Sequence, residues 1–362
     1  MSGNSQPKVS VLIPIYNVQA YLKECLDSLC AQTFDDFEAL CINDGSTDDS
    51  RKIILGYVER DPRFRLIDKQ NSGYGASMNR GMDEATGTYL AILESDDYCI
   101  PETLTRLVET IQHYDAQVVK ANCYYYWAGP PKKDVFYELV PRAQTNRVVN
   151  PQLEREIFYR TPAIWSALYR RDFLVDHNIR FNETPGASYQ DTSFNFKVWA
   201  NTTRAVFLPD AFVHYRQDNH NSSVNSPGKV YCVCDEYAEM DRYLDDHPQL
   251  VTDWLLALKA KLKFDTYMWN YERLSVELQP EFMRRMSEEM AAELEAGHVD
   301  WGLFEEWNQH ELESILQSPD IYHQRRLVAG DHSKVGKAIH FMRTGGIPLL
   351  AKVLANRFLN HR

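Results

Sequence analysis

The stretch VSVLIPIYN, residues 9–17, passes from an apolar run directly into polar residues. The run Val9–Ile15 is short for a helix and is bounded by polar residues, which favours a buried β-strand. Tyr21–Leu29 follows with apolar residues at helical spacing. The beginning of the chain is therefore predicted to be a strand that leads into a helix.

The same alternation continues over the first 130 residues. Further strands are predicted at 37–42, 63–68, 89–93 and 117–126, and helices at 47–59, 75–85 and 101–113. Alternating strands and helices with short connections predict an α/β fold, with a mostly parallel, Rossmann-like sheet covered by helices on both faces. Such sheets bind ligands at the carboxyl ends of their strands, so the polar residues there are the candidates for a site.

The pattern is less regular after residue 150. We expect helices at 152–159 and 191–199, and two separate strands at 205–208 and 212–216. From 230 to about 316 the chain is rich in Glu, Leu, Met and Trp and is expected to be helical.

Charge divides the chain of 362 residues, whose net charge is −12, into parts of opposite sign. Residues 231–330 carry 21 acidic and 9 basic residues, whereas residues 331–362 carry 1 acidic and 6 basic residues. We therefore predict an α/β domain at 1–225, an acidic helical domain at 226–330 and a basic amphipathic tail at 331–362. The acidic balance argues against a nucleic-acid partner, because a phosphate backbone needs a basic surface.

The expected location follows from what the sequence lacks. No apolar run approaches the roughly 20 residues of a membrane-spanning helix, and the polar N-terminus is unlike a signal peptide. The seven cysteines lack metal-type spacing and are expected to be reduced, as in a cytoplasmic protein. Leu350, Val353, Leu354 and Phe358 share one helical face of the basic tail, which could lie on the inner face of the cell membrane, bind a partner or simply pack.

Polar clusters follow four of the predicted strands. They are Tyr16-Asn17, Asn43–Ser50, Asn71–Gly81 and Glu94–Asp97. Each cluster alone fits ordinary turn or helix-cap chemistry. Together they predict one cleft, in which the three acids among residues 94–97 repel one another unless a cation lies between them. Oxygen ligands suit Mn²⁺ or Mg²⁺, and a metal held by one or two carboxylates keeps positions for substrate phosphates.

At these motifs the sequence resembles a known family. The ordered set VSVLIPIYN, CINDGSTDDS and NSGYGASMNRGMDEATGTYLAILESDD is similar to the GT-A catalytic core of family 2 glycosyltransferases, over about residues 9–216. The resemblance implies an inverting enzyme that uses a nucleotide-diphosphate sugar and a divalent metal. It also implies that the domain at 1–225 is the catalytic one.

The resemblance assigns donor contacts to specific positions. A nucleobase pocket is implied at the first two strand ends, ribose and sugar contacts at the later clusters, and a metal ligand in the last cluster. The implied donor-binding residues are Pro14, Tyr16, Asn17, Asp44, Asn71, Gly73, Gly75, Asn79, Glu94 and Ser95, and the implied metal ligand is Asp96. The family's Asp-x-Asp motif is Glu94-Ser95-Asp96 here, a departure that puts the ribose contact of Glu94 in doubt.

The resemblance also implies a catalytic base at the start of a later helix. Gln190-Asp191 stands where the family often has Glu-Asp, so Asp191 is the expected base, with a helix N-cap as the alternative. Arg216 could close over the diphosphate or belong to a solvated loop, and His214 could be an extra metal ligand or pack in a strand. Trp165 and Tyr169 could form an aromatic acceptor platform or pack in the core.

The leading hypothesis is a hexosyltransferase that moves a sugar from a UDP-sugar to a hydroxyl of a glycan or lipid-linked acceptor, in bacterial surface polysaccharide synthesis. The alternative is a catalytically inactive binding or scaffold subunit, and a homo-oligomer is compatible with either. A sugar nucleotidyltransferase or a dehydrogenase would need a Gly-rich loop after the first strand, where Tyr16-Asn17-Val18 stands instead. The sequence does not specify the sugar, the acceptor or the linkage.

Overall fold

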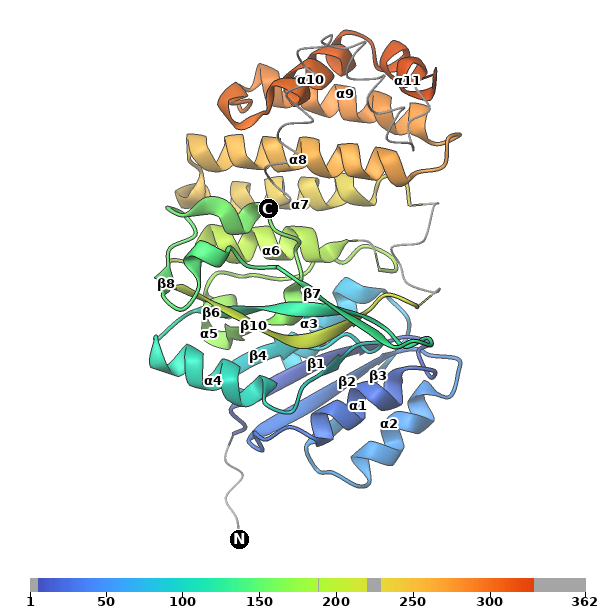
Figure 1. The fold of residues 1–362 in the computed structure, drawn as a ribbon, viewed down its shortest axis with the longest axis vertical. Coiled ribbons are helices and arrows are strands. Elements are labelled where there is room, and N and C mark those ends of the chain that lie inside the picture. Colours follow the sequence, from blue (N-terminus) through green and yellow to red (C-terminus); the bar gives the residue numbers. More distant parts are fainter. Residues whose placement is uncertain (1–5, 188, 220–228, 329–362) are drawn as a thin grey trace. The chain divides into compact units, whose positions relative to one another are not determined.

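The computed structural model describes residues 6–328, apart from 188 and 220–228 (Figure 1). Its centre is a ten-stranded sheet in the order β3-β2-β1-β4-β9-β6-β10-β5, with β7 paired to β6 and β8 to β10. The strands are β1 (Val9–Ile15), β2 (Phe37–Asp44), β3 (Phe64–Lys69), β4 (Tyr89–Ile92), β5 (Tyr98–Cys99), β6 (Val118–Trp127), β7 (Lys133–Tyr137), β8 (Val148–Val149), β9 (Ala167–Arg170) and β10 (Ala205–Arg216).

The first four main strands form the predicted parallel core. β3, β2, β1 and β4 are mutually parallel, as are β6 and β10, whereas β9 runs antiparallel between the two groups. All seven residues of β1 and all eight of β2 are buried, because these strands are covered on both faces. The α/β class predicted from the sequence is confirmed, in a sheet that is mixed at one side.

Helices cover both faces of this sheet. Alternate residues of β1 pack with apolar residues of three helices on one face, namely α1 (Leu22–Cys30), α2 (Ser50–Val58) and α4 (Thr103–His113). On the other face α3 (Tyr74–Glu84) packs against Leu12 and Ile42 at Gly81, where any Cβ would lie 3.0 Å from Ile42 Cδ1. The connections between strand and helix remain short, as the sequence predicts.

Two predictions for the chain after residue 150 were wrong, one of a strand pair and one of a helix. Residues 205–208 and 212–216 are one continuous strand, β10, whose register against β6 shifts between Phe207 and Ala211. Pro209 lies in the shifted section, where its missing N–H removes no ladder bond and its carbonyl accepts a hydrogen bond from Asn122 Nδ2 at 2.9 Å. The helix expected at 152–159 is only a short 3₁₀ segment, Arg155–Tyr159.

Glycines allow α3 to begin against another segment of backbone. A Cβ on Gly75 would lie 2.0 Å from the carbonyl oxygen of Asn182, and one on Gly73 would lie 2.8 Å from Thr184 O. Gly73 also has a φ of +94°, which disfavours other residues. The 182–186 segment therefore crosses directly over the start of α3 before it leads into α6 (Gln190–Asn201).

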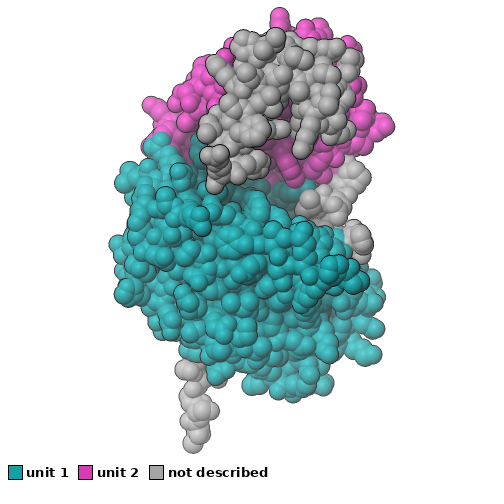
Figure 2. Space-filling view, viewed as in Figure 1, with its two compact units in different colours: residues 1–225, 238–243 teal, residues 226–237, 244–362 magenta. Residues whose placement is uncertain are grey.

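The chain forms two compact units, one of residues 1–225 with 238–243 and one of 226–237 with 244–362 (Figure 2). The second unit contains α8 (Asp253–Arg273), α9 (Gln279–Glu295), α10 (Glu306–Gln317) and α11 (Pro319–Val328), while α7 (Cys232–Asp246) contributes to both. Met283, Met286 and Met290 on α9 are fully buried, so this face of the helix is core. The predicted basic tail lies outside the described residues, and its membrane contact stays a prediction.

Some acidic residues of the helical unit form ion pairs in its interior. Lys263 on α8 pairs with Glu289 at 3.0 Å and with Glu293 at 3.2 Å, both on α9, and all three side chains are largely buried. Lys259 also pairs with Glu293, at 3.3 Å. None of the helices in the described residues combines the length and the apolar character that crossing a membrane requires.

The crossing at Gly75 gives a direct stability test. We expect Gly75→Ala to lower the free energy of unfolding by about 1–3 kcal/mol, because a backbone carbonyl blocks the new methyl group and cannot rotate away. Urea denaturation followed by circular dichroism measures this change.

Gly56→Ala is the matched control within α2. Apart from its chain neighbours and the backbone of its own helix turn, no described residue has an atom within 4 Å of a Cβ built at Gly56. Alanine there should therefore raise the free energy of unfolding by about 0.5–1 kcal/mol through its better helix propensity. Equal effects of the two substitutions would contradict the role assigned to Gly75.

Candidate active site

The first two strand ends are joined by side chains. Asn17, at a φ of 52°, receives hydrogen bonds on its Oδ1 from the backbone N–H of Thr47 at 2.8 Å and donates its own N–H to Ser46 Oγ at 3.1 Å. Pro14 is buried inside β1, whereas Tyr16 is 51% exposed directly after it. The ring of Tyr16 is thus free to contact a ligand at this edge, while Asn17 shapes the loop.

Asp44, at the end of β2, organises the loop that precedes α3. Its Oδ1 accepts the backbone N–H of Ser72 at 2.9 Å, its Oδ2 accepts that of Gly73 at 3.0 Å, and it pairs with Lys69. The carboxylate is only 5% exposed. Asn71 is exposed on the same loop. The structure therefore brings Asp44, Asn71 and Gly73 together.

Asn79 and Gln190 hold the segment that crosses α3. Asn79 Nδ2 donates to Phe181 O at 2.9 Å and to Glu183 Oε1 at 2.8 Å, and its Oδ1 accepts the N–H of Phe181 at 2.9 Å. Gln190 Nε2 donates to Thr184 Oγ1 at 2.8 Å and to Gly186 O at 3.1 Å. With its amide bonded in this way, Asn79 positions the chain that leads to Asp191, and its predicted donor contact stays untested.

Glu94 is bonded to α3. Its Oε1 accepts the hydroxyl of Tyr74 at 2.7 Å. The pKa of Glu94 is raised to about 8, mainly by burial and in part by the charges of Asp96 and Asp191, although the hydrogen bond from Tyr74 lowers it. The extra methylene of Glu94 relative to aspartate therefore reaches a partner within the protein. Ser95 beside it is 6% exposed.

Arg216 fixes the turn that carries Asp96 and Asp97. Its backbone N–H donates to Asp97 Oδ1 at 2.8 Å, and its Nε donates to the carbonyl oxygen of Asp96 at 2.9 Å. The guanidinium also pairs with Glu24 and with Asp218, and its side chain is only 3% exposed. Arg216 thus holds the acidic turn in place through these hydrogen bonds. Because its guanidinium is buried and already paired within the protein, this geometry does not support its predicted closure over a diphosphate.

The two acids of this turn differ in how much of their hydrogen-bonding capacity is used. Asp96 Oδ2 accepts the side-chain N–H of Asn219 at 2.7 Å. Asp97 Oδ2 is buried and has no hydrogen-bond partner among the described residues. Burial, followed by the charge of Asp96, raises the pKa of Asp97 well above its usual range. Buried acids with an unpartnered oxygen are suited to receive a cation.

Asp191 lies in the first turn of α6, where the helix begins at Gln190 and Tyr189 is the N-cap residue in a left-handed conformation. Backbone and hydroxyl groups of Thr192 donate hydrogen bonds to its carboxylate, yet Oδ1 is buried and has no partner in the described part of the chain. Burial raises the pKa of Asp191 to about 6. The N-cap alternative is therefore wrong, and one carboxylate oxygen stays available for a proton.

Lys120 is a buried cation that the sequence analysis missed. It lies within β6, is 1% exposed, and donates to Ser166 Oγ at 2.9 Å and to the carbonyl oxygen of Ala163. Burial lowers its pKa to about 7, and its charge lowers the pKa of Asp191. The sequence did carry a signal for this residue, because Lys120 stands between apolar residues in a predicted strand.

Two side chains considered from the sequence lie elsewhere. His214 stacks between Tyr98 and Tyr124 at centroid distances of 4.4 and 5.0 Å, and its Nδ1 is 2.8 Å from Asp134 Oδ1. It therefore packs within the strand, which was the alternative to a metal ligand. Tyr169 is 2% exposed and donates its hydroxyl to Ile164 O at 2.9 Å. Tyr169 is therefore core, and only Trp165 remains as an aromatic candidate.

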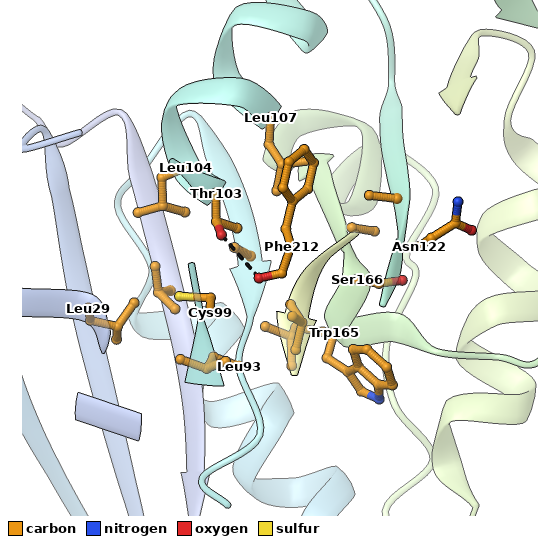
Figure 3. Close-up of a pocket in the computed structure, with 16 residues that line it drawn as sticks. Leu29, Leu93, Cys99, Thr103, Leu104, Leu107, Asn122, Trp165, Ser166 and Phe212 are labelled. Carbon is orange, nitrogen blue, oxygen red and sulfur yellow. Dashed lines mark hydrogen bonds between the residues drawn. The ribbon is translucent and has the colours of Figure 1, made fainter. Parts of the chain in front are cut away.

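A small cavity lies between side chains of the sheet and α4 (Figure 3). It is lined mainly by apolar side chains, including Leu93, Leu104, Trp165 and Phe212, with Asn122 and Ser166 at its border. Its volume of about 20 Å³ leaves room for about one water molecule, so it cannot accommodate a nucleotide sugar.

The residues present fit a divalent metal in part. The described residues contain no group of three or more His, Cys, Asp or Glu side chains arranged around a common point. Asp96 and Asp97 nevertheless offer carboxylate oxygens as ligands, one of which, on Asp97, has no partner in the described residues. The pKa values of Asp97 and of the nearby Glu94 are raised. Mg²⁺ and Mn²⁺ accept such ligands and commonly complete their coordination with phosphate and water.

The mixed, mostly parallel α/β sheet with acidic residues after its strands is compatible with the GT-A class of folds, and comparison with known proteins assigns it to that class. The sequence family described as glycosyl transferase family 2 matches residues 10–176. TarS 1–349 of S. aureus, crystallised in complex with UDP-GlcNAc, has a similar fold, with a TM-score of 0.64 at 21% identity over 87% of this chain and 89% of that one.

Two bacterial relatives extend the match in sequence. EpsJ of Bacillus subtilis, an uncharacterized glycosyltransferase, is 31% identical over 229 residues, or 62% of this chain and 64% of EpsJ. The glycosyltransferase GlyG of Streptococcus pneumoniae is 30% identical over 217 residues, or 58% of this chain and 70% of GlyG. The chain belongs to glycosyltransferase family 2, and it spans slightly less than two thirds of the length of EpsJ.

The effect of Lys120 on Asp191 can be measured without any activity assay. We expect the Asp191 carboxyl to titrate near pH 6 in the native protein and at a higher pH in Lys120→Met, because removal of the cation disfavours the carboxylate. A ¹³C NMR titration of labelled aspartate side chains reports both values. Lys259→Met, which removes another buried lysine, should leave the Asp191 titration unchanged, and an equal shift in both variants would contradict the assignment.

Proposed function

We propose that the protein is an inverting, metal-dependent glycosyltransferase that moves a sugar from a UDP-sugar to a hydroxyl of a glycan or lipid-linked acceptor. The observation that carries this proposal is Asp191 at the start of α6, a carboxylate with a buried oxygen that has no partner among the described residues. Its charge raises the pKa of Glu94, so the proposed base lies within electrostatic range of the acidic strand end.

The donor site is proposed at the ends of β1, β2 and β4. The exposed ring of Tyr16 can stack on a pyrimidine, and Asp44 fixes the loop at 71–73 along which the ribose and sugar would lie. The complex of the structurally similar TarS with UDP-GlcNAc supports a UDP-sugar as the donor.

Asp96 is the proposed metal ligand, with Asp97 beside it. A Mn²⁺ or Mg²⁺ ion bound there would neutralise the diphosphate and stabilise the charge of the departing nucleotide. Arg216 and Asn219 hold Asp96 in place through its carbonyl and its Oδ2. The fixed turn keeps the carboxylates of residues 96 and 97 together without the need for rearrangement when a donor enters.

The proposed reaction is a single displacement at the anomeric carbon. The acceptor oxygen forms the new bond to that carbon while the bond to the diphosphate oxygen breaks, and UDP leaves with the electron pair. Asp191 accepts the proton of the acceptor hydroxyl, a role suited to a carboxylate whose pKa lies near 6.

Asp191→Asn tests the base. We expect transfer to fall by about 10²–10⁴-fold, since an amide cannot accept the proton, while the affinity for UDP measured by calorimetry stays within about twofold. In the native protein kcat/KM should decline below about pH 6, where Asp191 becomes protonated. Full transfer activity in the variant would exclude Asp191 as the base.

A donor screen separates the enzyme from an inactive scaffold. We expect UDP release from at least one UDP-sugar in the presence of Mn²⁺ or Mg²⁺, its loss on chelation with EDTA, and its recovery when the metal is restored. Asp96→Asn should reduce release at every metal concentration. The absence of release from every UDP-, GDP- and dTDP-sugar would favour the scaffold alternative.

A further inference from the structure

Four aromatic rings form a continuous surface on one face of the sheet. Trp165 stacks on Tyr215 at a centroid distance of 4.8 Å and an interplanar angle of 15°. Tyr215 contacts Tyr125 at 5.8 Å, and Tyr125 stacks on Tyr137 at 4.2 Å and 13°. All four side chains are partly exposed. We name this set (Trp165, Tyr215, Tyr125 and Tyr137) the aromatic wall.

Strand pairing shows that the wall belongs to a single face. Tyr125 pairs with Tyr215 of β10, and Tyr137 pairs with Cys123, two residues from Tyr125 on β6. The intervening residues Tyr124, His214 and Phe136 form a second aromatic group on the opposite face. The two groups are therefore separated by the sheet itself.

The wall lies beside the proposed catalytic acids. The charges of Asp97, Asp96, Glu94 and Asp191 all act on the hydroxyl of Tyr215, and they add to the effect of burial in raising its pKa. Tyr215 directly precedes Arg216 in β10, and the backbone N–H of Arg216 donates to Asp97 Oδ1 at 2.8 Å, so this end of the wall adjoins the acidic turn.

The wall is also held in a fixed position. Lys120 binds the carbonyl oxygen of Ala163 and the hydroxyl of Ser166, the residues on either side of the Ile164-Trp165 pair. Buried Cys123, Leu139 and Ala163 pack behind Tyr125, Tyr137 and Trp165. A surface fixed in this way can bind a ligand with little loss of side-chain entropy.

We propose that the aromatic wall is the acceptor subsite and that it binds the apolar face of a pyranose ring, with an acceptor hydroxyl directed to Asp191. This inference rests on the proposed function, because it takes Asp191 as the base. Tyrosine and tryptophan combine a flat apolar surface with a polar edge, which matches a sugar ring whose C–H face is apolar and whose rim carries hydroxyls.

Charge favours a neutral sugar at this position over a phosphate. The wall contributes no charged side chain, so none of its four residues can pair with a phosphate group. An acceptor that carries a lipid phosphate would therefore place a sugar ring, and not the phosphate, against Trp165.

Binding of small sugars tests the subsite directly. In saturation-transfer NMR with UDP and Mg²⁺ present, we expect methyl β-D-glucopyranoside or methyl β-D-galactopyranoside to receive saturation from the protein, and acyclic ribitol to receive much less. Trp165→Ala and Tyr137→Ala should each weaken pyranoside binding about tenfold. Trp165→Phe should recover most of the binding, which separates a stacking role from a loss of folding.

Phe136→Ala is the matched control, because Phe136 neighbours Tyr137 in β7 but lies on the opposite face and is 49% exposed. It should leave pyranoside binding within about twofold of the native value. UDP release from the donor without acceptor should also be unchanged in Phe136→Ala.

The outcomes separate this inference from the proposed function. Equal binding of ribitol and the pyranosides, unchanged binding in both wall variants, or an equal loss in Phe136→Ala would overturn the acceptor subsite. Absence of UDP release from the native protein, with pyranosides still bound at the wall, would overturn the proposed activity and leave a sugar-binding surface.

Discussion

The close approach of two backbone segments at Gly73 and Gly75 is the constraint on which the site depends. The chain at 182–186 can cross the start of α3 only because no side chain stands there. Asn79 and Gln190 then bond to the crossing segment, and Asp191 follows it directly. The loop fixed by Asp44 and the helix that carries Asp191 are thereby built against each other, although more than 100 residues separate them in the chain.

The same region concentrates negative charge that the fold only partly compensates. Lys120 acts on Asp191, and Arg216 holds the turn of Asp96 and Asp97, while an oxygen of Asp97 and one of Asp191 are left without partners in the described residues. Burial raises the pKa of Glu94, Asp97 and Asp191, and the charges of neighbouring acids add to this effect at Glu94 and Asp97. An arrangement of this kind is costly without ligands and is completed by a cation and a proton donor, which agrees with the proposed reaction.

The sequence predicted what depends on local pattern and missed what depends on distant contacts. Apolar runs and their polar ends located β1, β2, β3 and β4 to within two residues and identified the acids at their ends. Family resemblance singled out Asp191 as the candidate base, a residue that periodicity alone would have assigned to a helix cap. The continuity of β10 depends on a register shift against β6, and the bonding of Asn79 and the position of Lys120 depend on segments 43 or more residues away. Such contacts leave no mark in the spacing of neighbouring residues.

The alternation of side chains along β6 and β7 has an evolutionary consequence. One hairpin presents Tyr125 and Tyr137 to one side and Tyr124 and Phe136 to the other, while the acids are supplied by β4 and α6. Residues on one side of this hairpin can be substituted without altering the residues that hold the turn of Asp96. With the acceptor bound at the aromatic wall as proposed, recognition of the acceptor can diverge among relatives while the proposed catalytic acids stay the same. The hairpin at 123–137 is accordingly the natural segment to exchange between relatives in order to redirect what is modified.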